Sequence, residues 1–189
     1  MLLTIGIEPD LKLAERLTFI QEDLGKIIES RHARVRWTRP EWLYFPIRFL
    51  GQINDTDVPD VCRVIESAVH DIEPFTISTA GIRAYPSPEC PRILSVSLQQ
   101  GLERLEALCK ALEQAFSMSA FRSDRRAYKP EIMLGRVSTP TERIDLTDCI
   151  KAIGDLNFGY SEIREVVLYG ADLLYSGPEY NVISRHDLG

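Results

Sequence analysis

Two stretches of the sequence place clustered basic residues next to strand-like runs, a combination that could bind phosphate groups. Residues 31–48 carry five arginines against one acid, Glu41, which gives a local charge of +4. Residues 122–136 carry four arginines and one lysine against Asp124 and Glu131, a local charge of +3. Because the whole chain has a net charge of −6, any contact with a nucleic acid must be local. The alternative is two solvated basic loops on an acidic protein.

The first basic stretch runs into a segment, 43–50, that is rich in aromatic and apolar residues and is predicted to be a strand. Side chains alternate between the two faces of a strand. The spacing therefore predicts that Tyr44, Pro46 and Arg48 share one face. Arg48 is then placed to bind an anion beside Tyr44, because a guanidinium can hold a phosphate through two hydrogen bonds.

The second basic stretch runs into the predicted strand 132–137. Alternation places Glu131 and Met133 on one face and nominally sends Arg136 to the other. A β-bulge, or a side chain that curls around the strand end, would return Arg136 to the face of Glu131. Arg136 is therefore the second residue that we expect to bind an anion.

The helices and strands that must position these residues can be predicted from the spacing and type of the apolar residues. Apolar residues at three- and four-residue spacing predict helices at 13–27, 58–72 and 102–115, with a shorter one at 146–156. Runs of β-branched and aromatic residues predict strands at 2–7, 35–37, 43–50, 75–82, 93–98, 132–137, 163–169 and 180–184. Consecutive strands are often too close for parallel crossovers, which predicts an α+β fold with largely antiparallel sheet. No linker interrupts residues 1–189, so we expect one domain.

Composition sets the class of protein. At 44% hydrophobic and 26% charged residues, the 189-residue chain is an ordinary globular sequence. It has no visible secretion signal and no apolar run long enough for a membrane span, so we expect a cytoplasmic protein that does not bind a membrane. Its cysteines are scattered, which argues against a disulfide framework, a metal site or a metal cofactor. They are Cys62, Cys90, Cys109 and Cys149.

Several segments, in order along the chain, resemble one family. They are the opening strand and helix, Arg36–Glu41, Arg48–Gly51, Pro91–Leu94, Lys129–Pro130, Val166–Tyr169 and Gly177–Tyr180. These segments resemble the two-histidine (2H) phosphoesterase superfamily, specifically the bacterial RNA 2′,3′-cyclic phosphodiesterases, also called the 2′-5′ RNA ligase family. The resemblance implies a bilobed α+β fold, with helices packed outside two largely antiparallel sheets. It also implies that each lobe contributes an H-x-T-x strand to a central groove.

At both H-x-T-x motifs the sequence departs from the family. Tyr44 and Pro46 stand where the first motif has histidine and threonine, and Glu131 and Met133 stand where the second has them. Opening a cyclic phosphate needs one group to accept a proton and another to donate one, which suits imidazole at neutral pH. The reference pKa values of tyrosine and glutamate, about 10 and about 4.3, are far from neutrality. Proline offers no donor, methionine only a thioether, and a carboxylate repels phosphate.

Three functions follow from this departure. The chain is a catalytically inactive homologue that keeps a groove for a nucleotide, a phosphate-bearing RNA end or a protein partner. Alternatively it is an active phosphodiesterase with a rebuilt site that uses Tyr44 and Glu131, or a protein-interaction scaffold with a closed groove. The histidines elsewhere in the chain, His32, His70 and His186, lack the spacing needed to face the groove, so we predict no catalytic residue.

Overall fold

The computed structural model describes residues 1–30, 33–121, 129–138, 144–174 and 177–189. In these ranges the helices are α1 (Leu11–Glu29), α2 (Val58–Val69), α3 (Leu102–Ser117) and α4 (Thr147–Ile153). The strands are β1 (Leu2–Ile7), β2 (Arg34–Trp37), β3 (Phe45–Gln52), β4 (Phe75–Tyr85), β5 (Ile93–Gln100), β6 (Glu131–Ser138), β7 (Asn157–Ile163), β8 (Glu165–Leu174) and β9 (Gly177–Asp187).

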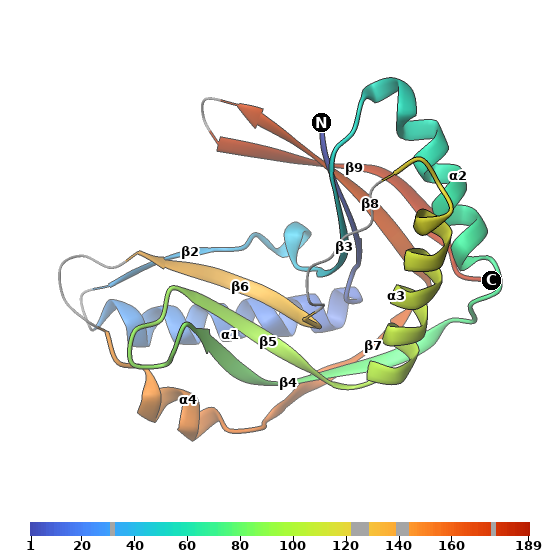
Figure 1. The fold of residues 1–189 in the computed structure, drawn as a ribbon. Coiled ribbons are helices and arrows are strands. Elements are labelled where there is room, and N and C mark those ends of the chain that lie inside the picture. The colour runs from blue at the N-terminus through green and yellow to red at the C-terminus, as the bar shows by residue number, and fades with distance from the viewer. Residues whose placement is uncertain (31–32, 122–128, 139–143, 175–176) are drawn as a thin grey trace.

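The strands form two antiparallel sheets, one in each lobe. Sheet A has the order β3-β1-β8-β9, and sheet B has the order β2-β6-β5-β4-β7. The sheets adjoin where β3 contacts β6 (Figure 1). The predicted α+β fold with two largely antiparallel sheets is therefore confirmed.

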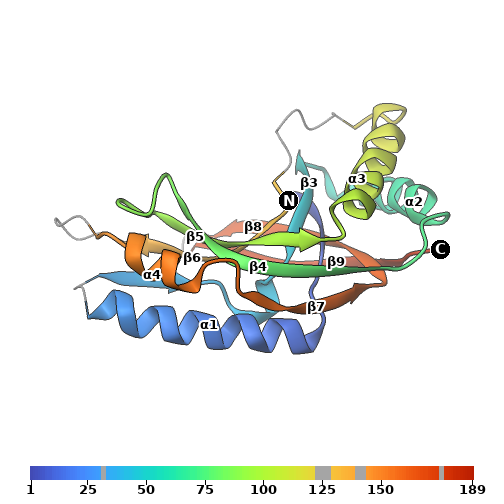
Figure 2. The same ribbon diagram turned by 90° about the horizontal axis from the view of Figure 1, so that it is seen from below.

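Helices cover one face of each sheet. Asp10 begins α1, because its Oδ1 accepts a hydrogen bond of 2.8 Å from the Leu13 amide. The apolar stripe of α1, which includes Leu13, Leu17 and Leu24, is buried, and α1 contacts β2, β6 and β7 of sheet B. On the other lobe α2 and α3 pack together, and α2 contacts β9 of sheet A. Figure 1 shows α2 and α3 outside sheet A, and Figure 2 shows α1 along one side of sheet B.

The opposite face of each sheet, turned away from these helices, is called its inner face below. Residues directly opposite each other in an antiparallel ladder share a face. In sheet A, Thr4 lies between Phe49 and Tyr169, and these define the inner face. In sheet B the inner face is defined by the paired residues Ser97 and Glu131.

The structure differs from the sequence-based expectations around residues 146–163, and parts of both basic stretches lie outside the described residues. Strand β7 was not predicted, and the helix expected over 146–156 ends at Ile153, directly before Gly154, whose φ is +54°. Arg31 and His32, and Arg122, Asp124, Arg125 and Arg126 of the second basic stretch, lie outside the described residues. Among the helices that the structure describes, none is both long and apolar enough to cross a membrane.

Candidate ligand-binding site

The two strands that carry the predicted site share one irregularity. In β3, Ile47 has no partner in β1, because Arg48 pairs with Ile5 and Pro46 pairs with Gly6. In β6, Leu134 likewise has no partner in β5. Each is a β-bulge at the residue directly after the threonine position of its motif, and a bulge reverses the alternation of the side chains that directly follow it.

The first bulge makes the expectation for Arg48 wrong. Arg48 lies opposite Ile5, whose other neighbour is Leu168, and therefore on the helix-covered face rather than beside Tyr44 and Pro46. Its side chain is 4% exposed and forms an ion pair with Glu113 of α3. Its guanidinium also lies 4.8 Å from the ring centroid of Phe116. Arg48 thus joins sheet A to α3, while Pro46 remains on the inner face.

The second bulge has the opposite effect on Arg136. Arg136 pairs with Ile93, which lies two residues from Ser95 on the inner face, so the arginine is exposed there as a bulge would require. On its other side Arg136 lies directly opposite Arg36 of β2, which is also exposed. The inner face of sheet B therefore holds two arginines directly across the ladder from each other.

A buried glutamine of α1 stabilises the second bulge. Gln21 is 4% exposed, and its Nε2 donates hydrogen bonds of 2.9 Å to the carbonyl oxygens of Thr38 and Leu134. The Leu134 carbonyl belongs to the bulged residue and also accepts a 2.8 Å hydrogen bond from the Thr38 amide, so Gln21 is its second donor and ties α1 to the bulge.

Replacing Gln21 with leucine should lower the free energy of unfolding by about 1 to 2 kcal/mol, because the hydrogen bonds from its buried amide to the Thr38 and Leu134 carbonyls are both lost. Urea denaturation measures the change. Gln114→Leu, at an exposed position of α3, is the matched control and should change the free energy of unfolding by less than about 0.5 kcal/mol. Equal effects of the two substitutions would contradict a role for Gln21 at the bulge.

Tyr44 lies in a stack of rings on the inner face of sheet A. Its ring centroid is 4.4 Å from that of Tyr169, with an angle of 30° between the planes. A Cβ at Gly6 would lie 2.5 Å from Cδ2 of Tyr44, so the ring lies flat against β1 only because residue 6 is glycine. Trp42 meets the other ring, Tyr169, edge-on at 6.1 Å.

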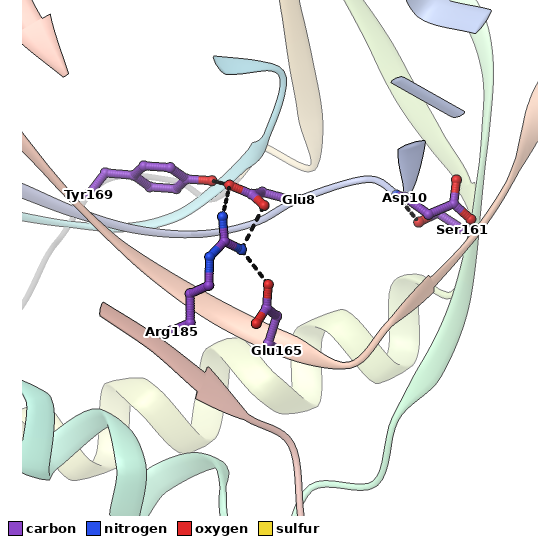
Figure 3. Close-up of polar contacts among 6 residues, drawn as sticks. All are labelled: Glu8, Asp10, Ser161, Glu165, Tyr169 and Arg185. Atoms are coloured by element: carbon purple, nitrogen blue, oxygen red, sulfur yellow. Dashed lines mark hydrogen bonds and ion pairs between the residues drawn. The ribbon is translucent and has the colours of Figure 1, made fainter. Parts of the chain in front are cut away.

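A charged network holds the Tyr169 ring of this stack (Figure 3). The Tyr169 hydroxyl donates a 2.7 Å hydrogen bond to Oε1 of Glu8. Arg185 donates to both carboxylate oxygens of Glu8, at 2.8 and 3.2 Å, and also to Glu165. Burial, followed by the bond to Glu8, raises the pKa of Tyr169 well above its usual value. Tyr169 therefore keeps its proton and its position.

Glu131 lies on the inner face of sheet B, where two hydroxyl groups hold its carboxylate. The Tyr85 hydroxyl donates to Oε1 at 2.5 Å, and the Ser95 hydroxyl donates to Oε2 at 2.8 Å. The bond to Glu131, with burial, raises the pKa of Tyr85.

Two basic side chains lie near Glu131 but contact other groups. Lys129 lies 4.8 Å from the centroid of the Tyr85 ring, and Nε of Arg83 donates to Ser97 at 3.1 Å. Met133, at the threonine position of the second motif, is half-buried.

The four motif positions are thus brought to the inner faces of adjoining sheets. In the part of the chain that the structure describes, no group of three or more histidine, cysteine or acidic side chains is arranged to hold a metal ion. His70 is 81% exposed and bonds Asp71, and His186 bonds Ser184 on β9, so neither faces Tyr44 or Glu131.

Residues 47–169 match the family described as the 2′-5′ RNA ligase superfamily. The chain belongs to this superfamily. The RNA 2′,3′-cyclic phosphodiesterase of Methanothermobacter thermautotrophicus is 27% identical to it over 176 residues, 93% of this chain and 92% of that protein.

Two solved structures share the fold of this 2′-5′ RNA ligase superfamily member. One, from Thermus thermophilus, has a TM-score of 0.76 at 20% identity, and the match covers 100% of this chain and 98% of that one. The other, Escherichia coli LigT complexed with 3′-AMP, has a TM-score of 0.73 at 15% identity and the same two coverages.

Sequence reasoning missed several residues of this superfamily member's site. Arg36 was recognised as part of a basic stretch and of a segment that resembles the family but not as a binding residue, although its spacing from Arg34 in a strand was a usable signal. Tyr85 and Tyr169 gave no such signal. Each reaches an acidic residue that is distant in the sequence, Glu131 and Glu8 respectively, so only the folded sheets bring them together.

Proposed function

We propose that this protein binds a nucleotide or an RNA end on its inner faces, through the phosphate, without hydrolysing it. It would then be a catalytically inactive, RNA-binding member of its superfamily. The scattered cysteines, predicted to be reduced thiols, fit a cytoplasmic location.

The observation that carries the proposal is the pair of opposed arginines, Arg36 and Arg136. Like charges directly opposite each other in an antiparallel ladder destabilise the sheet. Neither arginine has an acidic side chain within ion-pair distance among the described residues. An anion between the two guanidinium groups would relieve the repulsion, and phosphate suits both because each can bind it through two hydrogen bonds.

The side chains at the two motifs support binding without turnover. Tyr44 is packed between Gly6 and Tyr169, and neither Pro46 nor Met133 can donate to a phosphate oxygen. Tyr85 is the hydroxyl nearest to Glu131, but its raised pKa makes it a weaker acid than an ordinary tyrosine. No imidazole stands at either motif.

The ligands bound in solved structures of Escherichia coli LigT support a nucleotide as the ligand of this protein. Escherichia coli LigT has been solved with 3′-AMP, NADP⁺, phosphate and ATP, four ligands that share a phosphate group. The chain covers 92% and 96% of the lengths of two curated relatives.

Arg36→Ala and Arg136→Ala should each weaken the binding of a short fluorescent RNA about tenfold, because each removes charge-assisted hydrogen bonds to phosphate. Each should also reduce the slope of log K against log salt by roughly 0.7, the contribution of one phosphate contact on a single strand. Fluorescence anisotropy over a salt series measures both quantities. Arg63→Ala removes a charge from α2 and is the matched control that should leave binding unchanged.

The alternatives predict other outcomes in the same assay. Failure of the native protein to bind any RNA or nucleotide would favour a scaffold that binds a protein partner. Hydrolysis of the cyclic phosphate that is lost in Tyr44→Phe or Glu131→Gln would favour the rebuilt active site.

The role of Arg48 differs from the one that the sequence predicted. Arg48 is not expected to contact the ligand, and Arg48→Ala should instead weaken the packing of α3 on sheet A.

A further inference from the structure

We propose that Glu131 recognises the free 2′,3′-cis-diol of an RNA 3′ end and discriminates against ends that carry a terminal phosphate. The inference rests on the proposed function and narrows it. The phosphates held by Arg36 and Arg136 would then belong to the RNA backbone, and the terminal ribose would lie at Glu131.

The carboxylate of Glu131 is oriented but not saturated. An ionised carboxylate offers about four acceptor positions on its two oxygens. Tyr85 and Ser95 occupy one position on each oxygen, at 2.5 and 2.8 Å. Because these two donors come from neighbouring strands, the carboxylate is held in one orientation. One further acceptor position remains on each oxygen, which matches two vicinal hydroxyl groups that each donate one hydrogen bond.

The charge of Glu131 is left available to a ligand. Several basic side chains share its surroundings, yet within the described residues none lies within ion-pair distance of its carboxylate. Nε of Arg83 donates instead to Ser97, and Lys129 lies over the ring of Tyr85. A terminal phosphate in direct contact with Glu131 would meet a carboxylate that has no ion-pair partner, whereas neutral hydroxyls would gain charge-assisted hydrogen bonds.

A ligand cation is a poorer match than a diol. An ammonium group could also donate to Glu131, but Arg83, Lys129 and Arg136 would repel it from the same face. Hydroxyl groups carry no charge and are not affected in this way. The carboxylate therefore favours a neutral donor pair in a ligand whose negative charge lies elsewhere.

The spacing of Glu131 and Arg136 fits an RNA 3′ end. The two residues lie on one face of β6, five positions apart with one bulge between them. At about 3.3 Å per residue, four extended steps separate them by about 13 Å along the strand. That distance leaves room for a terminal nucleoside at Glu131 and a backbone phosphate at Arg136 and Arg36.

The test compares four fluorescent RNAs of one sequence that differ only at the 3′ end. The ends are the free diol, the 2′-deoxy sugar with a 3′-hydroxyl, the 3′-phosphate and the 2′,3′-cyclic phosphate. By fluorescence anisotropy the native protein should bind the free diol at least about tenfold more tightly than the 3′-phosphate. The 2′-deoxy end should fall between them, because it keeps one of the two donors.

Variants assign the preference to Glu131. Glu131→Gln should abolish the preference by weakening binding of the diol and strengthening binding of the 3′-phosphate. Tyr85→Phe keeps the carboxylate but removes one of its two orienting donors, and should reduce the preference only in part. Glu103→Gln, an exposed position on α3, removes the same charge elsewhere and should leave the preference intact.

Three results would overturn the inference in distinguishable ways. Equal or tighter binding of the 3′-phosphate by the native protein would refute recognition of the diol while leaving RNA-end binding in place. Binding of none of the four RNAs would refute both the inference and the proposed function. A preference for the diol that survives in Glu131→Gln would also refute the role given to this residue.

Discussion

Nucleoside 2′,3′-cyclic phosphates should be hydrolysed by this protein at least about 10⁴-fold more slowly than by the Methanothermobacter thermautotrophicus phosphodiesterase assayed beside it. Proton transfer by one positioned side chain contributes about 10² to 10⁴ in rate, and two such groups are replaced here. Tyr44 is packed against Tyr169, and Glu131 already accepts hydrogen bonds from two hydroxyls. Pro46 and Met133 further remove donors that would stabilise charge on the phosphate oxygens.

Chromatographic separation of the cyclic phosphate from the opened monoester measures this reaction. The relative, at the same concentration and in the same buffer, shows that the assay detects turnover. Tyr44→Phe and Glu131→Gln show whether any residual rate belongs to these positions. A rate within about tenfold of the relative that disappears in either variant would contradict the prediction.

Stability should fall steeply at alkaline pH, and Tyr169 should be a main cause. Burial and the bond to Glu8 raise the pKa of Tyr169 in the folded protein, whereas an unfolded tyrosine titrates near 10. Below pH 10 both states keep the proton, and the contribution to stability is complete. Above pH 10 the unfolded state loses the proton first, so it binds fewer protons than the folded state. The free energy of unfolding then falls by about 1.4 kcal/mol per pH unit.

Tyr169→Phe should remove this component of the slope, a difference of about 2.5 kcal/mol accumulated by pH 12. Urea denaturation at a series of pH values from 8 to about 12 measures it. Part of the slope should remain in the variant, because the pKa of Tyr85 is raised as well. Tyr160, which is 56% exposed on β7, provides the control substitution Tyr160→Phe. Identical slopes for the native protein and Tyr169→Phe would show that another group causes the alkaline loss.

Much of the fold could be predicted because its elements are locally encoded. The first strand matches Leu2–Ile7, and the helical stripes at 58–72 and 102–115 correspond to α2 and α3. Strand β7 was missed because its sequence, Asn157–Ile163, has a glycine near its centre and only two large buried apolar residues, Phe158 and Ile163. Its partners in β4 stabilise it, and those contacts are not visible in a local window.

The candidate site could be predicted only in part, because a bulge is set by strand pairing rather than by residue type. Simple alternation placed Arg48 with Tyr44, and the bulge at Ile47 moved it to the helix-covered face. The corresponding bulge at Leu134 placed Arg136 on the inner face, which alternation alone opposed. The contact between Gln21 and the Leu134 carbonyl spans 113 positions of the chain, so no local sequence pattern predicts it.

The strand order of sheet A has a consequence for how the protein is made on the ribosome. Strand β1 lies between β3 and β8, so Leu2 pairs with Ala171. Strand β1 emerges long before β8 during synthesis and therefore keeps one edge unpaired until residues 165–174 have left the exit tunnel. An unpaired edge is a template for pairing with other chains, and closing so long a loop slows folding. Nascent chains that stall before residue 165 should therefore aggregate or recruit chaperones, whereas chains in which β8 is free to pair should not.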